Sequence, residues 1–158
     1  MRKYFLLSAV AMLMTTTANA TTDYAEVTAK ATIQIANKME CTDLNFGTIV
    51  VKQNNAASKL IFDYDAFANG EFTATGDILS YTGMKHTHCL FSSENAEADI
   101  DSYERNIILT GENGGTMSVD IELLEADTNY ADFGGTLNIP EKVTAGTYTG
   151  SFGVSTVY

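Results

Sequence analysis

The last thirteen residues of the chain read GTYTGSFGVSTVY, from Gly146 to Tyr158. Because side chains alternate between the two faces of a strand, one face of this segment carries Tyr148, Gly150, Phe152, Val154, Thr156 and Tyr158. The other face is small and mostly hydroxylated. The β-branched and aromatic residues, together with the absence of proline, predict a strand. We expect the fold to end on this strand, which then needs a partner on each flank or presents an edge that pairs with other chains.

A second segment, Thr21 to Ile35, has the same alternation in a purer form. Its apolar positions are every second residue, with polar side chains between them: Ala25, Val27, Ala29, Ala31, Ile33 and Ile35. This period of two predicts a strand rather than a helix. Burial of the apolar face would contribute on the order of 7–12 kcal/mol. Because the free energy of burial is this large, we expect the segment to dock on another β-sheet.

Residues 1–20 have the features of a secretory signal. Arg2 and Lys3 precede an apolar run from Tyr4 to Met14, and Ala18-Asn19-Ala20 is a small-x-small cleavage site. The alternative, a retained membrane helix, is disfavoured by the short apolar run and its flanks. Cleavage after Ala20 would leave 138 of the 158 residues, the size of one ordinary domain. We therefore expect export across the inner membrane, with no membrane insertion after cleavage.

The charge of the chain is strongly negative. The 158 residues contain nine Lys and Arg against twenty Asp and Glu. Two of the basic residues and none of the acidic ones lie in residues 1–20, so the mature chain has seven basic and twenty acidic residues and a net charge of −13. A surface of this sign repels nucleic acid and anionic lipid, and neither is an expected partner.

Cys41 and Cys89 are the two cysteines of the chain. In an oxidising compartment one disulfide between them is the expected arrangement, and the chain-entropy relation gives it about 4 kcal/mol of stabilisation. A pair of metal-binding thiolates or a free catalytic thiol is the alternative. No His or other Cys lies near Cys41 in the sequence to support either one.

Between these features the chain shows eight or nine short strand patterns, separated by turn signals, and no convincing helix. Besides the two terminal segments, we expect strands over residues 43–51, 60–64, 71–75, 86–92, 106–110, 117–124 and 135–139. Asn69-Gly70 indicates a hairpin turn, and Gly47 a bulge or a close approach of two strands. Residues 93–102 and 127–133 are expected to be irregular. The pattern predicts a single all-β domain, an antiparallel β-sandwich of the immunoglobulin-like (Ig-like) type, with a closed barrel as the alternative.

No catalytic or cofactor motif stands out. His86 and His88 would project from one strand face and could chelate a metal ion, although a solvated pair is the simpler interpretation. Four acidic residues in one loop could surround calcium but lack the spacing of a calcium loop: Glu94, Glu97, Asp99 and Asp101. The pair Asp63 and Asp65 could suggest a glycosidase, without any sign of a cleft. We predict no enzyme activity, no cofactor and no metal.

The ends of the chain resemble those of bacterial chaperone–usher pilins. Gly146 and Tyr158 match a glycine about a dozen residues from the end and a near-terminal tyrosine, and Cys41 is spaced like the first pilin cysteine. Residues 44–49 (LNFGTI) and 145–152 (AGTYTGSF) are also similar to signatures of a family of secreted bacterial Ig-like proteins of unknown function. That resemblance extends over most of residues 33–158 and includes two Gly-Gly-Thr sequences, at 114–116 and 134–136.

The pilin resemblance implies a sandwich that lacks one strand, which the N-terminal extension of the next subunit supplies by strand addition. It would make residues 21–32 the candidate donor strand, with Ala25, Val27, Ala29 and Ala31 as its inward side chains, and residues 33–158 the Ig-like domain. The receiving groove would be lined by the last strand, with the candidate residues Gly146, Tyr148, Gly150, Phe152, Val154 and Tyr158. The implied partners are other copies or related subunits, a periplasmic chaperone and an outer-membrane usher.

Three functions follow as hypotheses. The first is a structural subunit of a bacterial surface fibre, a pilus or fimbria, that passes through the periplasm to the cell surface. The second is a secreted or periplasmic Ig-like binding or adhesin module, monomeric because its N-terminal segment completes its own sheet. The third, a secreted hydrolase, would need a concave pocket with coupled titrating groups.

Overall fold

The computed structural model of the protein describes residues 28–33, 39–91 and 99–157. The chain divides into two units, residues 1–34 and 35–158, and each is described by itself. In the first unit, residues 28–33 form neither helix nor strand, and their side chains are exposed. The expected signal at residues 1–20 and most of the expected strand at 21–35 lie outside the described residues.

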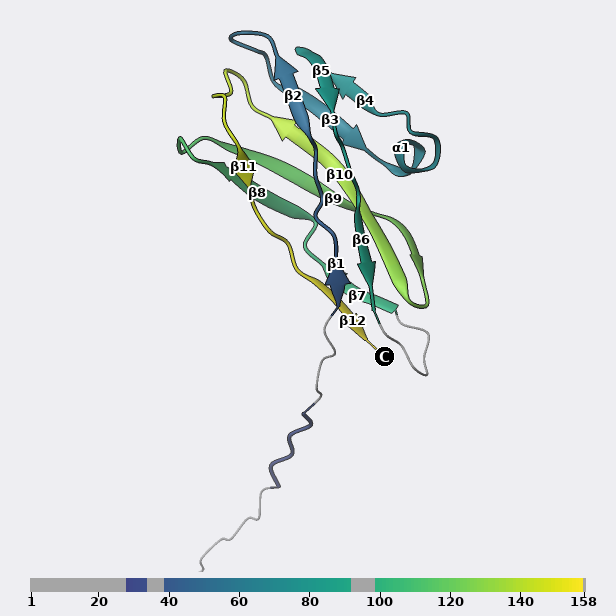
Figure 1. Ribbon diagram of the computed structural model, residues 1–158. Coiled ribbons are helices and arrows are strands. Elements are labelled where there is room, and N and C mark those ends of the chain that lie inside the picture. The colour runs from purple at the N-terminus through teal and green to yellow at the C-terminus, as the bar shows by residue number, and fades with distance from the viewer. Residues whose placement is uncertain (1–27, 34–38, 92–98, 158) are drawn as a thin grey trace, which may run out of the picture. The chain divides into compact units, whose positions relative to one another are not determined.

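The second unit is all-β apart from one short helix, and its antiparallel sheets form a curled sandwich of the Ig-like class, as the sequence predicts (Figure 1). Its elements in chain order are β1 Glu40–Cys41, β2 Thr48–Val51, β3 Ser58–Phe62, α1 Tyr64–Asn69, β4 Thr73–Thr75, β5 Ile78–Thr82, β6 Thr87–Leu90, β7 Asp99–Tyr103, β8 Asn106–Gly111, β9 Thr116–Asp127, β10 Tyr130–Ile139, β11 Tyr148–Thr149 and β12 Val154–Val157.

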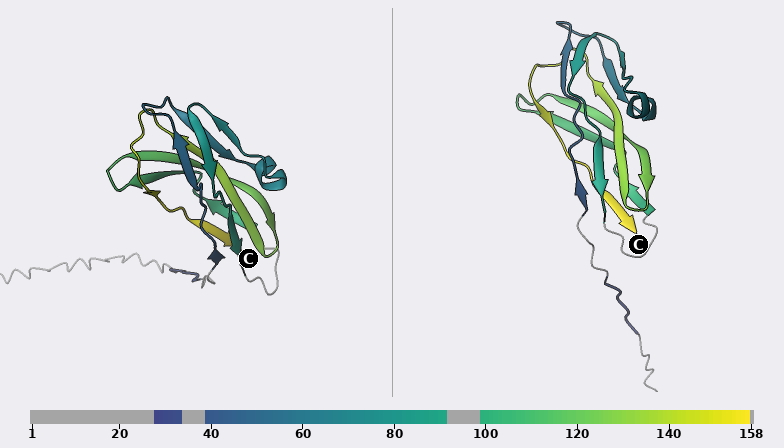
Figure 2. Two further views of the ribbon diagram at one scale, coloured as in Figure 1. Left: turned by 45° about the horizontal axis from the view of Figure 1, so that its top comes forward. Right: turned by 45° about the vertical axis from the view of Figure 1, so that its right-hand side comes forward.

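The long β9–β10 hairpin organises the main sheet, whose strand order is β1-β6-β10-β9-β8-β11. The first half of β10 pairs with β6, and its second half, Gly135–Ile139, pairs with β3, which in turn pairs with β4. Two further antiparallel pairs are separate: β2 with β5, and β7 with β12. Figures 1 and 2 show β3, β4 and α1 at one end of the unit and β7 and β12 at the other. The two outer strands of the main sheet are therefore β1, the first strand of the unit, and β11, the last but one. Within the described residues these two strands do not pair, so the sheet does not close into a barrel.

The core lies between the layers and is built on the inward face of each strand. Phe133, on β10, is completely buried and contacts the rings of Tyr103 and Phe152 at centroid distances of 5.3 and 6.0 Å. The alternation expected along the last segment is present except at Gly150, which is exposed: Tyr148, Phe152, Val154 and Thr156 are partly buried, and Thr149, Ser151, Gly153 and Ser155 are exposed. The other buried apolar residues include Leu60, Phe62, Cys89, Ile107, Val119, Ile121, Leu137 and Ile139.

The absence of helix was a wrong prediction. Residues 64–69 form α1, because Asp63 caps its start by accepting a hydrogen bond from the Ala66 backbone N–H at 3.0 Å. Gly70 ends the helix in the left-handed region, at φ 74°, and its N–H donates to the Ala66 carbonyl. The Asn69-Gly70 pair is thus a helix cap rather than a hairpin turn, and the expected strand over 60–64 is β3, two residues earlier.

Other boundaries also differ from the sequence predictions. Residues 127–133 are not irregular, since β9 and β10 extend to a tight turn between Asp127 and Tyr130. Residues 99–103, expected in a loop, form β7 because β12 supplies their partner. The last segment is two short strands, β11 and β12, rather than one continuous strand. The expected strand over 43–51 is reduced to β2, and Gly47 makes the close approach that the sequence indicated: a Cβ there would lie 2.0 Å from the Thr82 carbonyl oxygen.

Candidate functional site

The second unit contains a groove of about 1430 Å³. One wall is the first part of the unit, residues 39–54, which includes β1 and β2, and the other is the last part, residues 142–154, which includes β11. Figure 1 draws the first wall in blue and the second in yellow. The groove therefore lies between two segments that are about a hundred residues apart in the sequence.

The groove stays open because the two walls do not hydrogen-bond to each other along their length. β1 and β2 pair with β6 and β5, and β11 and β12 pair with β8 and β7. Among the described residues no ladder joins the first two strands to the last two. Each wall thus offers a free strand edge, with unpaired backbone N–H and C=O groups, towards the other.

Asn55 holds the walls together at one end of the groove. Its side chain is buried; Nδ2 donates to the Pro140 carbonyl, and Oδ1 accepts from the Val143 N–H. The Asn55 carbonyl also accepts from the Lys142 N–H. Nothing in the sequence singles out Asn55, because only the fold brings residues 140–143 next to it.

The floor of the groove is apolar. It is made by side chains of the core strands: Cys89, Ile107, Leu109, Met117, Val119, Leu137 and Ile139. Leu109 and Met117 are only partly buried, which leaves apolar surface open within the sandwich. Thr87 also lines the groove, and its hydroxyl is buried without a hydrogen-bond partner in the described part of the chain. An apolar floor between two free strand edges is suited to an extended peptide with an apolar face.

Five of the six candidate residues of the last segment line this groove: Gly146, Tyr148, Gly150, Phe152 and Val154. The Tyr148 hydroxyl donates to the Thr144 carbonyl at 2.6 Å, and its ring packs on Gly111. Phe152 links the wall to the core through Phe133. The sixth residue, Tyr158, lies outside the described residues.

Of the candidate donor residues, Ala25 and Val27 lie outside the described residues. Ala29 and Ala31 are described, and both are exposed in a segment without regular secondary structure. Ile33, on the same alternating face, has 88% of its surface exposed. The strand expected for this segment is therefore not formed over residues 28–33.

Cys41 and Cys89 form the expected disulfide. They face each other in register on β1 and β6, and Cys89 is completely buried. This excludes both alternatives, a thiolate metal site and a free thiol, because no free cysteine remains. The disulfide fastens the first wall of the groove to the main sheet.

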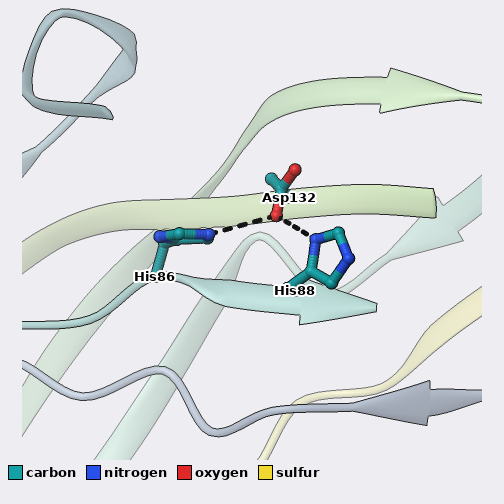
Figure 3. A group of neighbouring side chains, drawn as sticks. All are labelled: His86, His88 and Asp132. Carbon is teal, nitrogen blue, oxygen red and sulfur yellow. Dashed lines mark hydrogen bonds and ion pairs between the residues drawn. The ribbon is translucent and has the colours of Figure 1, made fainter. Parts of the chain in front are cut away.

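The remaining polar candidates divide into three groups. The Asp63 carboxylate caps α1 and so has a structural role. Asp65 lies exposed in the first turn of that helix. Glu94 and Glu97 lie outside the described residues, and Asp99 and Asp101 are part of β7. His86 and His88 both reach the buried carboxylate of Asp132 on β10 (Figure 3), a residue that the sequence analysis did not connect with them.

Comparison with protein families gives one match. The model of a family described as "Domain of unknown function (DUF4402)" matches residues 33–158. Comparison with curated proteins and with solved structures gives no significant match. No helix in the described part of the chain is long and apolar enough to cross a membrane.

Proposed function

The chain belongs to this DUF4402 family, and we propose that it is a non-enzymatic structural subunit of a bacterial surface fibre, pilus- or fimbria-like, assembled by exchange of its N-terminal strand. Residues 1–20 would direct its export to the periplasm, and residues 21–32 would then insert into the groove of a neighbouring copy. The observation that carries the proposal is the groove itself, which lies between two free strand edges and has an apolar floor.

The groove and the N-terminal segment are complementary in chemistry. A strand placed between the walls would hydrogen-bond to one or both edges, and every second side chain would point to the floor. The segment from residue 21 to 35 has apolar residues at every second position. Three of the four in residues 21–32 are alanines, which suits a floor already partly filled by Leu109 and Met117.

Insertion into another copy is a head-to-tail contact, because the donor and the groove are different parts of the subunit. Such contacts extend into filaments unless the rotation between copies closes them into a ring. Until a donor arrives, the open groove would need a temporary occupant, and a periplasmic chaperone followed by an outer-membrane usher is the proposed route.

The direct test uses a chain that keeps the groove but lacks the N-terminal strand. A chain of residues 33–158 is mixed with a peptide of residues 21–33, and binding is measured by calorimetry and by the rise in melting temperature. The matched controls are two peptides of equal length and charge, Val27→Asp on the apolar face and Thr28→Asp on the polar face. We expect the Thr28→Asp peptide to bind and the Val27→Asp peptide to bind at least about tenfold less tightly, because an unpaired carboxylate would enter an apolar floor.

Equal binding by the two variant peptides, or no binding by the natural one, would contradict the proposal. The alternative function is a self-complemented, monomeric Ig-like binding or adhesin module. It predicts that residues 21–158 stay monomeric at all concentrations while removal of residues 21–31 lowers the melting temperature of the single chain.

A further inference from the structure

A second cluster of polar side chains lies on the sheet surface opposite to the groove. Side chains alternate along β6, so Thr87 and Cys89 line the groove while His88 and His86, the residue just before β6, line another cleft. Asp132 is directly across from His88 in the β6–β10 register. Figure 3 shows the two imidazole rings directed at the same carboxylate.

The three side chains present their polar atoms to one point. Asp132 Oδ1 lies 2.7 Å from His88 Nδ1 and 3.3 Å from His86 Nε2. The two ring nitrogens and the carboxylate oxygen all lie within 4.8 Å of one another. Nitrogens and oxygens bound to one tetrahedral Zn²⁺, at bond lengths of about 2.0–2.2 Å, are separated by about 3.3 Å. The His88–Asp132 separation would have to widen by about half an ångström, and the two ring nitrogens, within 4.8 Å of each other, would have to approach by up to about 1.5 Å.

The Asp132 carboxylate lacks a permanent positive partner. Only 5% of its side-chain surface is exposed, and its ion-pair partners among the described residues are the two imidazoles, with no Lys or Arg. A buried carboxylate is costly unless its charge is compensated. A bound cation would supply that compensation while the imidazoles stay neutral.

We propose that His86, His88 and Asp132 form a binding site for a divalent transition metal ion, of the class represented by Zn²⁺. Zn²⁺ binds well to two imidazole nitrogens and one carboxylate oxygen. Ca²⁺ and Mg²⁺ prefer sites made entirely of oxygen atoms. Three protein ligands leave the fourth position of a tetrahedral ion for water.

The surroundings hold the rings in place and still leave a route for the ion. Phe67 of α1 packs edge-on against His86 at a centroid distance of 5.0 Å, and Tyr130 lies 5.5 Å from His88. The two imidazole side chains are 37% and 40% exposed. They border a cleft of about 700 Å³ whose lining includes Asp43 and Asn45. The site is thus partly preformed and open to solvent.

A metal ion here would cross-link the β6 segment to β10 on one face of the sheet, whereas the disulfide ties β6 to β1 on the groove side. The same ion would fasten α1 through the His86–Phe67 contact. This site is separate from the groove and does not depend on the fibre proposal, so the two can fail independently.

The test is calorimetric titration of ZnCl₂ into residues 21–158 without an affinity tag, at neutral pH. We expect one Zn²⁺ per chain and a melting temperature raised by at least about 5 °C at a hundredfold excess of free ion over Kd, reversed by a chelator. CaCl₂ should give no comparable effect. Replacing a residue that only hydrogen-bonds to a metal ligand weakens metal binding by about 10–100-fold. Asp132→Asn and His86→Gln each remove a ligand itself, so we expect them to weaken Zn²⁺ binding by about 100-fold or more.

The matched control is Asp127→Asn, an exposed carboxylate in the same β9–β10 hairpin. It removes the same charge, and an asparagine can still accept the Thr128 N–H bond that Asp127 makes. Binding should be unchanged in this variant. His86→Gln keeps the test decisive if Asp132→Asn does not fold, because His86 is at the surface. No Zn²⁺ binding, or binding that His86→Gln and Asp127→Asn leave equally intact, would overturn the proposal.

Discussion

Among the described glycines, Gly47 leaves the least room for a side chain. It has a φ of 71° and lies against the Thr82 carbonyl, where any side chain would clash. We predict that Gly47→Ala lowers the free energy of unfolding by about 2–4 kcal/mol, because both the backbone strain and the clash must be relieved. Urea denaturation measures this. Gly153→Ala is the control, since nothing lies within 4 Å of a Cβ at that position.

Asp120 is a residue whose ionisation supports the fold. Hydrogen bonds from the side-chain amides of Asn138 and then Asn106 hold the pKa of its carboxyl below the ordinary value. Because the folded pKa lies below the unfolded one, this stabilisation is present above about pH 4 and is lost as the pH falls through the folded pKa.

The corresponding prediction concerns Asp120→Asn. The variant should be less stable than the natural chain at neutral pH, and the difference should shrink as the pH is lowered from 5 towards 2 (about the range in which carboxyl groups titrate). Melting temperatures of both chains across this range provide the measurement. A difference that stays constant with pH would mean that the charge of Asp120 does not contribute.

At the scale of elements, the Cys41–Cys89 disulfide determines how firmly the first wall of the groove is attached. β1 has only two residues, and the two cysteines are 48 positions apart in sequence. We predict that replacing both cysteines by serine costs about 4 kcal/mol of stability, from the loop entropy returned to the unfolded chain. Equilibrium unfolding of the oxidised and the doubly substituted chains tests this, and a loss below about 1 kcal/mol would contradict it.

Successive side chains of β8 point to opposite faces, so one lies in the groove and the next on the outer surface. Leu109 lies in the groove floor, whereas its neighbour Ile108 is 56% exposed. If the groove receives a strand, Leu109→Arg should abolish binding of the 21–33 peptide, because a charged side chain would occupy the apolar floor. Ile108→Arg should leave binding unchanged. Circular dichroism of both variants checks that each is folded, and equal effects would argue against insertion.

At the scale of the whole molecule, head-to-tail assembly predicts how incomplete subunits behave. A chain without residues 21–31 can accept a strand but cannot donate one, and Leu109→Arg can donate but cannot accept. Each should fail to polymerise alone, and a mixture should give only 1:1 dimers. Analytical ultracentrifugation of the separate and mixed chains gives the answer. Longer oligomers in the mixture would refute this mode of assembly.

The sequence by itself determined the class of the fold, the alternation along its last segment and the disulfide. Alternation over the last thirteen residues indicated a strand with one buried face, and Tyr148, Phe152 and Val154 are indeed on the inner side. The export signal expected at residues 1–20 predicted a disulfide between Cys41 and Cys89, and that disulfide is present. These features are local or compositional, so neighbouring residues and overall content were sufficient to recognise them.

Only the tertiary structure decided which segments meet. The groove requires residues 39–54 and 142–154 to lie on either side of one floor, and Asn55 to join them at one end. The site of His86 and His88 requires Asp132 from another strand. Short α1 was missed because a single capped turn carries almost no periodic signal. Strand pairing joins residues that are far apart in the chain, so its register is set by packing of the whole sandwich rather than by any stretch read alone.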